Sequence, residues 1–223
     1  MSSMRALVSP QLRTLLRPQV LRASPRFMRV QTAALSSAIS DAIIQDHHEL
    51  EKYYIEVINS TDYDHQQCLG NQFVWELVRH SIGEELVVYP AFEKYMGPKG
   101  QEMADSDRQK HHKVKELLKE FQNMKSTDPA YVPKLKELWA LLWQHIQEEE
   151  KIDLPALEQS LKAQGEETEF LARRFDRTKK FVPTRSHPRA GEKPLFETVM
   201  GLMAAPMDKL ADILRKFPDQ SKL

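Results

Sequence analysis

Apolar side chains recur every three or four residues in four segments of the chain, and short polar breaks separate them. We place these segments at residues 39–59, 69–96, 102–124 and 129–163. This spacing is typical of amphipathic α-helices that bury one face. Short connections between long helices favour antiparallel neighbours. The pattern therefore predicts an all-α fold, an antiparallel up-down four-helix bundle.

Glycine, proline and small polar residues mark the breaks, at residues 59–62, 97–100 and 126–129. In the last break, Asp128 suits a helix N-cap and Pro129 suits the first helical position. Pro90 and Pro155 lie inside the second and fourth segments, where each removes a backbone donor. We expect each proline to bend or end its helix.

The chain divides into three parts: a leader over residues 1–38, the bundle over 39–165 and an extension over 166–223. Residues 166–194 are rich in basic residues and proline, which predicts an irregular strap. Residues 195–217 form an amphipathic stretch that is interrupted near Pro206. We expect this stretch to dock on the bundle as a helix, and a membrane-surface or partner helix is the alternative.

Composition narrows the class of protein further. Seven glycines in 223 residues favour helices, and the single Cys68 excludes an intrachain disulfide framework. No run of eighteen apolar residues is present, so we expect no transmembrane segment. Beyond residue 40 the chain carries 26 basic and 32 acidic residues. This mildly acidic body argues against nucleic acid as the main partner.

Two targeting signals point to different organelles. The first forty residues hold six arginines and no acidic residue, with many serines, which is the composition of a mitochondrial transit peptide. The sequence ends in Ser221, Lys222 and Leu223, a peroxisomal address at an extreme C-terminus. We expect mitochondrial delivery, with peroxisomal or dual delivery as the alternative.

An internal repeat links the second and fourth helices. Residues 80–90 and 145–155 share the pattern H-x3-E-E-x4-P, 65 residues apart. The pair His47 and His48 precedes the first copy, and His111 and His112 precede the second. The bundle therefore resembles a duplicated helical hairpin, in which each half supplies one early histidine and one H-x3-E motif.

Six polar residues fall on the apolar stripes of the four helices: His47, His80, Glu84, His111, His145 and Glu149. On the fourth helix the stripe is predicted to run Leu135, Leu138, Leu142, His145, Glu149, Ile152 and Ala156. The neighbouring His48, His112, Glu85 and Glu150 are one position off the stripes and are expected on the flanks.

A metal site explains why these six polar residues lie on faces that are otherwise apolar. Burying an unpartnered carboxylate costs several kcal/mol, at least in order of magnitude. Residues four apart on a helix lie side by side, so His80 and Glu84 can share one centre, as can His145 and Glu149. Two divalent cations would supply the missing countercharge. The alternative is that Glu84 and Glu149 are buried general acids without metal.

These segments resemble the hemerythrin, or HHE cation-binding, family. The likeness is carried by Asp46-His47, residues 80–85, Lys110-His111 and residues 145–150, and it covers roughly residues 39–163. It is strongest to fungal HHE proteins, which share the segment at residues 181–188. The resemblance implies a non-haem di-iron centre, two iron ions joined by oxygen as Fe–O–Fe, that meets O2 at an open position.

The resemblance also implies ligand roles. The four histidines would be terminal ligands, Glu84 would bridge, and Glu149 would take the place of a second bridging carboxylate. The third helix departs from the H-x3-H of oxygen carriers, because Asp107 precedes His111 by four residues and Lys115 follows it by four. Asp107, Glu51 and Glu150 are the possible additional ligands. Imidazole and carboxylate ligands also suit Mn or Zn.

Three functions follow. The first is a metal-binding protein, without assigned catalytic residues, that binds or reacts with O2 or another small diatomic or peroxide ligand in sensing, buffering or iron handling. The second, ranked lower because the sequence shows no substrate pocket, is a di-iron oxidase, peroxidase-like enzyme or iron-centre repair enzyme. The third is a helical interaction module without metal.

Overall fold

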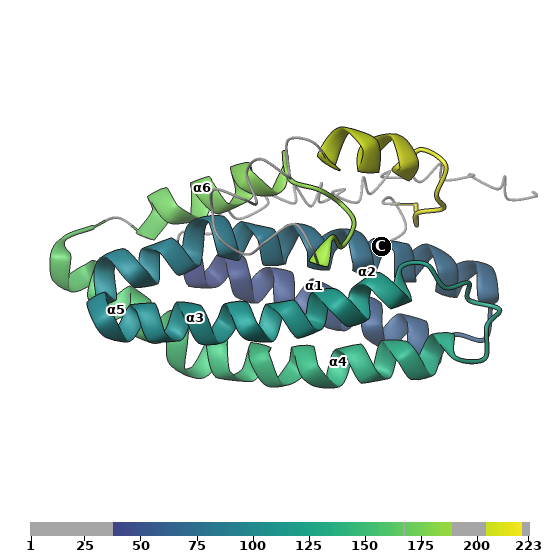
Figure 1. The fold of residues 1–223 in the computed structure, drawn as a ribbon, viewed down its shortest axis with the longest axis horizontal. Helices are drawn as coiled ribbons and strands as arrows, with labels where there is room; N and C mark the ends of the chain where they lie inside the picture. Colours follow the sequence, from purple (N-terminus) through teal and green to yellow (C-terminus); the bar gives the residue numbers. More distant parts are fainter. Residues whose placement is uncertain (1–37, 167, 189–203, 220–223) are drawn as a thin grey trace, which may run out of the picture. The chain divides into compact units, whose positions relative to one another are not determined.

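The computed structural model describes residues 38–166, 168–188 and 204–219. Every element in these ranges is helical (Figure 1). The elements are α1 (Ile39–Asn59), α2 (Tyr63–Gly83), η1 (Glu84–Val88), α3 (Tyr89–Phe121), α4 (Tyr131–Glu148), η2 (Glu149–Asp153), α5 (Leu154–Gln164) and α6 (Thr168–Lys179). The predicted leader and the terminal Ser221-Lys222-Leu223 lie outside the described residues, so both targeting signals stay predictions.

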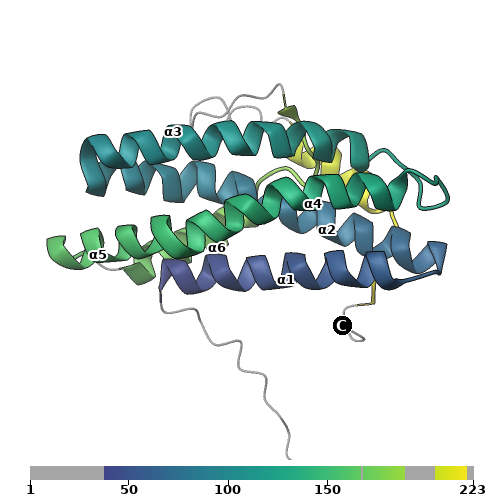
Figure 2. The ribbon, with the colours of Figure 1, turned by 90° about the horizontal axis from the view of Figure 1, so that it is seen from below.

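The helices run up and down in an antiparallel bundle, which confirms the predicted all-α class (Figures 1 and 2). The third bundle helix is contained in α3, which spans a sharp reversal at Gly97. There the backbone takes φ 60° and ψ −140°. Glycine tolerates this conformation because it lacks a Cβ, and Pro98 follows as a residue without an N–H. The predicted break at residues 97–100 is therefore confirmed.

Two helix starts differ from the prediction. The second helix begins at Tyr63 instead of residue 69, because the Asp62 carboxylate accepts hydrogen bonds from the backbone N–H of Asp64 and His65. The fourth begins at Tyr131 instead of Pro129. Asp128 instead closes a turn, in which its side chain accepts the N–H of Ala130 at 2.8 Å.

Neither Pro90 nor Pro155 ends its helix. Each follows a five-residue π-helical turn, η1 or η2, and the chain continues as α3 or α5. The π turn places one extra residue in the helix, which changes the face that later residues occupy. Ile152 is consequently 56 % exposed, and the buried face continues through Asp153 and Leu154. The predicted stripe through Ile152 is wrong for this reason.

Two separate apolar clusters fill the bundle. On α1, for example, Ile39 and Ile43 belong to one cluster, Leu50 and Val57 belong to the other, and His47 lies between them. On each of the other three bundle helices, the polar residues likewise lie between the two clusters. The polar core residues therefore form one layer of the bundle, with an apolar cluster on each side of it along the bundle axis.

The segment after the bundle is more regular than expected. Residues 168–179 form α6, where an irregular strap was predicted, because Leu171, Ala172 and Phe175 form a short buried stripe. These side chains pack in the same apolar cluster as Ile43. The high Arg and Lys content concealed this helix, and packing stabilises it where local pattern is weak.

Residues 204–212 form a further helix. Pro206 lies in its first turn, where no backbone donor is needed, so the predicted interruption there is wrong. Asn71 of α2 donates to the Lys216 carbonyl at 2.8 Å, which ties the segment to the bundle. Residues 195–203 of the predicted stretch lie outside the described residues. Among those described, no helix has the length and apolar character needed to cross a bilayer.

Gly83 offers a test of how α6 packs on the bundle. A Cβ at this position would lie 2.7 Å from Cε2 of Phe175. We expect Gly83→Ala to lower the free energy of unfolding by about 1–3 kcal/mol through overpacking, although alanine favours helices. Urea unfolding and hydrogen exchange of α6 measure this. In a Phe175→Leu background, where the contact is relieved, Gly83→Ala should cost less stability than it does in the wild-type protein. A Gly83→Ala protein that is more stable than wild type would contradict the close packing.

Candidate metal centre

The structure brings all six predicted ligands into one buried cluster. Within it are two groups of three whose ligand atoms lie within 4.8 Å of one another. The first group is His47, His80 and Glu84, and the second is Glu84, His111 and His145. Glu84 belongs to both groups, so its two carboxylate oxygens serve two neighbouring positions.

Each glutamate joins the two halves of the repeat. Glu84 Oε1 lies 3.1 Å from Nε2 of His80 in its own hairpin, and Oε2 lies 3.3 Å from Nε2 of His111 in the other. Glu149 Oε2 lies 3.8 Å from Nε2 of His145 and 3.4 Å from Nε2 of His47. The cluster therefore has the approximate two-fold arrangement that the duplicated sequence predicts.

Several inward-facing atoms of this cluster lack hydrogen-bond partners among the described residues, although Nε2 of His111 and Nε2 of His145 lie 3.0 Å apart. The atoms without a partner include both carboxylate oxygens of Glu84 and Glu149 and the Nε2 atoms of His47 and His80, all fully buried. Unsatisfied buried carboxylates are costly in a core, and native structures rarely contain several together. A cation at each group would satisfy these atoms. The donor set thus fits a metal ion on physical grounds.

Burial and mutual repulsion displace the pKa values of the cluster. Burial, reinforced by the nearby Glu149, raises the pKa of Glu84 to about 8. Burial lowers the pKa of His145 to about 3. At His80 burial acts in the same direction, but Glu84 and Asp46 outweigh it and raise the pKa to about 10. Protons therefore hold this charge balance without metal, and a bound cation would replace them.

Each histidine also faces a carboxylate on its outer side, through Nδ1. The pairs are His47 with Glu150 Oε1 at 2.8 Å, His80 with Asp46 Oδ2 at 3.2 Å, His111 with Glu85 Oε1 at 3.0 Å and His145 with Asp107 Oδ1 at 3.7 Å. A carboxylate behind a ligating histidine orients the ring and leaves Nε2 free to bind metal. The outer layer therefore supports a metal-binding role.

Lysines stabilise three of these outer carboxylates. Lys179 from α6 lies 2.6 Å from Asp46 Oδ1. Lys115 lies 2.5 Å from Glu85 Oε2, and Lys110 lies 3.0 Å from Asp107 Oδ1. Lys115, four residues after His111 on α3, therefore supports His111 through Glu85.

The outer carboxylates correct one part of the prediction. Glu85 was expected on a flank, yet it is fully buried and contacts His111. The π turn η1 carries both Glu84 and Glu85, and η2 carries Glu149 and Glu150. The wider π turn lets two consecutive carboxylates approach the core. The repeated Glu-Glu before a proline was the sequence signal for this arrangement.

The three possible additional ligands lie outside both groups of three. Asp107 and Glu150 lie on the outer side of His145 and His47. Burial, reinforced by Glu149, raises the pKa of Asp107 to about 7. Glu51 is half-buried on α1. His48 is exposed and His112 is partly exposed, as their flank positions predicted.

Tyr89 is a site residue that sequence reasoning missed. Its hydroxyl lies 2.9 Å from Nε2 of His111, and its ring is fully buried. The equivalent position in the second repeat is Leu154, so the two halves differ here. A polar aromatic in only one copy of the repeat was the available signal.

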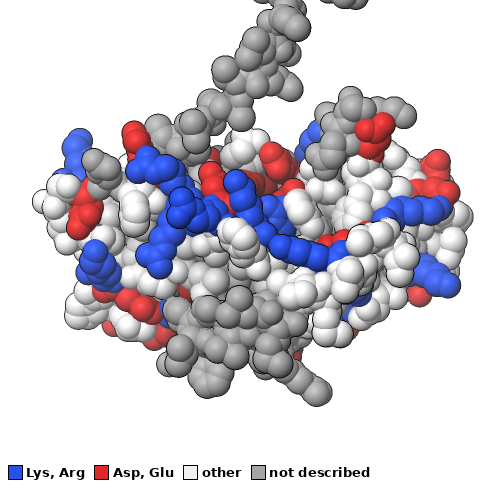
Figure 3. All heavy atoms as spheres, turned by 90° about the horizontal axis from the view of Figure 1, so that it is seen from above, with Lys and Arg blue, Asp and Glu red and all other residues white. Residues whose placement is uncertain are grey.

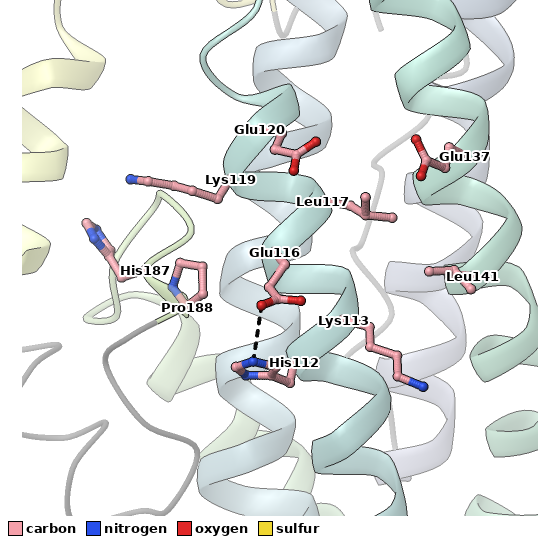
Figure 4. A pocket seen from close by; sticks show the side chains of 10 residues that line it. All are labelled: His112, Lys113, Glu116, Leu117, Lys119, Glu120, Glu137, Leu141, His187 and Pro188. Carbon is pink, nitrogen blue, oxygen red and sulfur yellow. Dashed lines mark ion pairs between the residues drawn. The ribbon is translucent and has the colours of Figure 1, made fainter.

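One pocket between α3 and α4 is separate from this cluster. It measures about 1040 Å³ and is lined by α3, α4 and the segment at residues 187–188, as Figure 4 shows. His112 and Glu116 face each other there at 3.5 Å. None of the six cluster residues lines it.

Comparison with known proteins identifies the family of this chain. The model of the hemerythrin HHE cation binding domain matches residues 38–157. This chain is a member of the hemerythrin HHE cation-binding family. An uncharacterised hemerythrin-like protein of Schizosaccharomyces pombe is 54 % identical over 180 residues, which cover 81 % of this chain and 88 % of that protein.

A more distant relative is a Nostoc protein named DNA nickase. It is 26 % identical over 148 residues, which cover 66 % of this chain and 40 % of the nickase. No solved structure matches the chain. Family membership agrees with buried His and Glu groups that could hold a cation.

Asp46 tests the outer layer of this hemerythrin-like site. Because Asp46 orients His80 and is held by Lys179, Asp46→Asn should weaken metal binding by about 10- to 100-fold. Competition titration with a chelator measures the affinity. Glu102→Gln is the matched control, since Glu102 is an exposed carboxylate of α3. Equal affinities of Asp46→Asn and the control would contradict the supporting role.

Proposed function

We propose that this hemerythrin-like protein binds two iron ions and uses them to bind or react with O2 or a related small molecule, in sensing, buffering or iron handling. The observation that carries the proposal is the shared Glu84, which belongs to both groups of potential ligands. Its two oxygens face different histidines, His80 and His111. Each of two adjacent positions therefore offers imidazole and carboxylate ligands to one cation.

Six side chains would hold the ions: His47 and His80 on one side, His111 and His145 on the other, with Glu84 and Glu149 between them. A pair of iron ions would supply one-electron redox chemistry and a place for a small ligand. The two apolar clusters above and below exclude bulk water from this level. Tyr89 places a phenol O–H inside the same enclosure.

The ligand set favours reaction or sensing over reversible oxygen carriage. The third helix supplies a single histidine to the cluster, His111, and Asp107 stands behind His145. Carboxylate donors are harder than imidazole and stabilise the ferric state. Manganese and zinc also suit imidazole and carboxylate donors, so iron rests on the family resemblance together with this chemistry.

DNA nicking is not part of this proposal. The nickase shares 40 % of its length with this chain, and residues 38–166 carry 24 acidic and 14 basic residues. Such an excess of negative charge opposes binding to a phosphate backbone.

Iron loading tests the proposal directly. Protein loaded with Fe(II) without oxygen and then exposed to air should retain two iron ions per chain and develop ferric charge-transfer absorption. Mössbauer spectra should show a diamagnetic ground state from two coupled ferric ions. Glu84→Gln should lose iron from both positions, while the exposed His48→Gln should retain it.

A colourless wild-type protein without retained iron would overturn the proposal. Thermal stability separates this outcome from the metal-free interaction module. Because a ligand that binds the native state stabilises it, iron should raise the melting temperature of wild-type protein and leave Glu84→Gln nearly unchanged. A melting temperature that is insensitive to metal in both proteins would favour the metal-free module.

Tyr89 favours a second candidate function, a di-iron oxidase or peroxidase-like enzyme. A buried O–H donor inside a redox site can stabilise developing negative charge on a reduced oxygen ligand. We expect Tyr89→Phe to keep its iron but to slow multiple-turnover consumption of O2 or H2O2 by about a hundredfold, the usual cost of one such donor. A single oxidation event without turnover in the wild-type protein would exclude the enzyme.

A further inference from the structure

Exposed apolar side chains gather on the C-terminal part of the chain. Eleven large apolar side chains are exposed among the described residues, and six of them belong to residues 168–214. These residues make up only a small share of the described part of the chain. These six are Phe170, Phe181, Met207, Leu210, Ile213 and Leu214. Leu214 is 89 % exposed. We call this set the C-terminal apolar surface.

The orientation of the helix at residues 204–212 is fixed by its acidic side chains, which face the protein. The Asp208 carboxylate accepts the N–H of Thr184 at 3.2 Å and of Arg185 at 3.1 Å. Asp212 accepts the Thr184 hydroxyl at 2.6 Å. Because the polar face is held by these hydrogen bonds, the apolar face of the helix is left outward.

Positive charge accompanies the C-terminal apolar surface. The described residues 168–188 and 204–219 carry nine basic and five acidic residues, whereas residues 38–166 carry 14 basic and 24 acidic. Figure 3 shows Lys and Arg side chains in a band across the face that carries α6 and the last helix. Lys209 donates to the Lys180 carbonyl at 2.9 Å, which joins the two segments. The acidic bundle thus carries a band of basic side chains on this side.

A small pocket on α6 is rich in arginine. It measures about 430 Å³ and is lined by Phe170, Arg173, Arg174, Arg177 and Thr178. Within the described part of the chain, neither Arg174 nor Arg177 has an acidic partner, whereas Arg173 pairs with Glu169. Guanidinium groups bind phosphate oxygens in a bidentate manner, and an aromatic side chain beside them suits an acyl boundary.

We propose that this face binds the surface of a bilayer that contains anionic phospholipids. Exposed apolar side chains would enter the boundary between headgroups and acyl chains, and the basic band would meet the negative headgroups. A two-fold dimer through the same face would place basic residues against basic residues. An anionic membrane surface instead complements the positive charge of the basic band. It can also contact exposed apolar side chains that are distributed over three segments of the chain.

Liposome co-sedimentation of the full-length protein tests this. Vesicles of phosphatidylcholine with phosphatidylserine should bind it, phosphatidylcholine alone should bind it weakly, and added salt should reduce binding. Each arginine near such a surface contributes about 1 kcal/mol, a factor of about five. Arg174→Gln/Arg177→Gln should therefore bind about twenty-five-fold more weakly, and Leu210→Ser/Ile213→Ser/Leu214→Ser should lose most binding.

Matched controls separate this face from the rest of the chain. Lys136→Gln and Ile152→Ser remove an exposed charge and an exposed apolar side chain from α4 and η2, and both should bind like wild type. The comparison also separates this face from the six arginines of residues 1–37, which stay in every variant. All variants should keep the wild-type metal content and circular dichroism.

Three results would overturn the proposal. The first is wild-type protein that does not distinguish anionic from neutral vesicles. The second is C-terminal variants that bind as tightly as the controls. The third is a wild-type dimer that the triple serine variant converts to a monomer in sedimentation equilibrium without any change in lipid binding, which would assign the surface to a second copy of the chain.

Discussion

Two carboxylates buried among histidines are the constraint on which the rest of this structure depends. Glu84 and Glu149 are completely enclosed, and within the described ranges neither has a hydrogen-bond partner for either oxygen. A core tolerates such groups only if countercharge is supplied at the same level. The apolar clusters on both sides keep water away, which strengthens every interaction within the cluster.

The π turns are the local device that makes this level possible. An ordinary α-helix would carry Glu85 and Glu150 around to the flank, about 100° from the preceding residue. The π turns η1 and η2 instead bring each second carboxylate behind a histidine of the other hairpin, His111 or His47. Pro90 and Pro155 lie two residues after the π turns and lack an N–H, so the interrupted hydrogen-bond ladder loses little there.

Support for the site also extends beyond the four bundle helices. Lys179 of α6 reaches Asp46, which in turn faces His80, so the C-terminal segment is linked to a candidate ligand through two contacts. Phe175 packs edge-on against His80 with ring centroids 6.1 Å apart. The same helix carries Arg174 and Arg177 on its exposed side. α6 therefore connects the candidate metal centre with the basic surface.

The sequence by itself determined the bundle and the six inward-facing residues, because helical periodicity alone decides which side chains share a face. The spacing of His80 with Glu84 and of His145 with Glu149 is local information, and the repeat made it visible. Only the tertiary structure decided the π turns, the buried position of Glu85, the contact of Tyr89 with His111, and the formation of α6. These features depend on contacts between distant residues, such as His47 with Glu150 and Asp46 with Lys179, whose pairing no local pattern encodes.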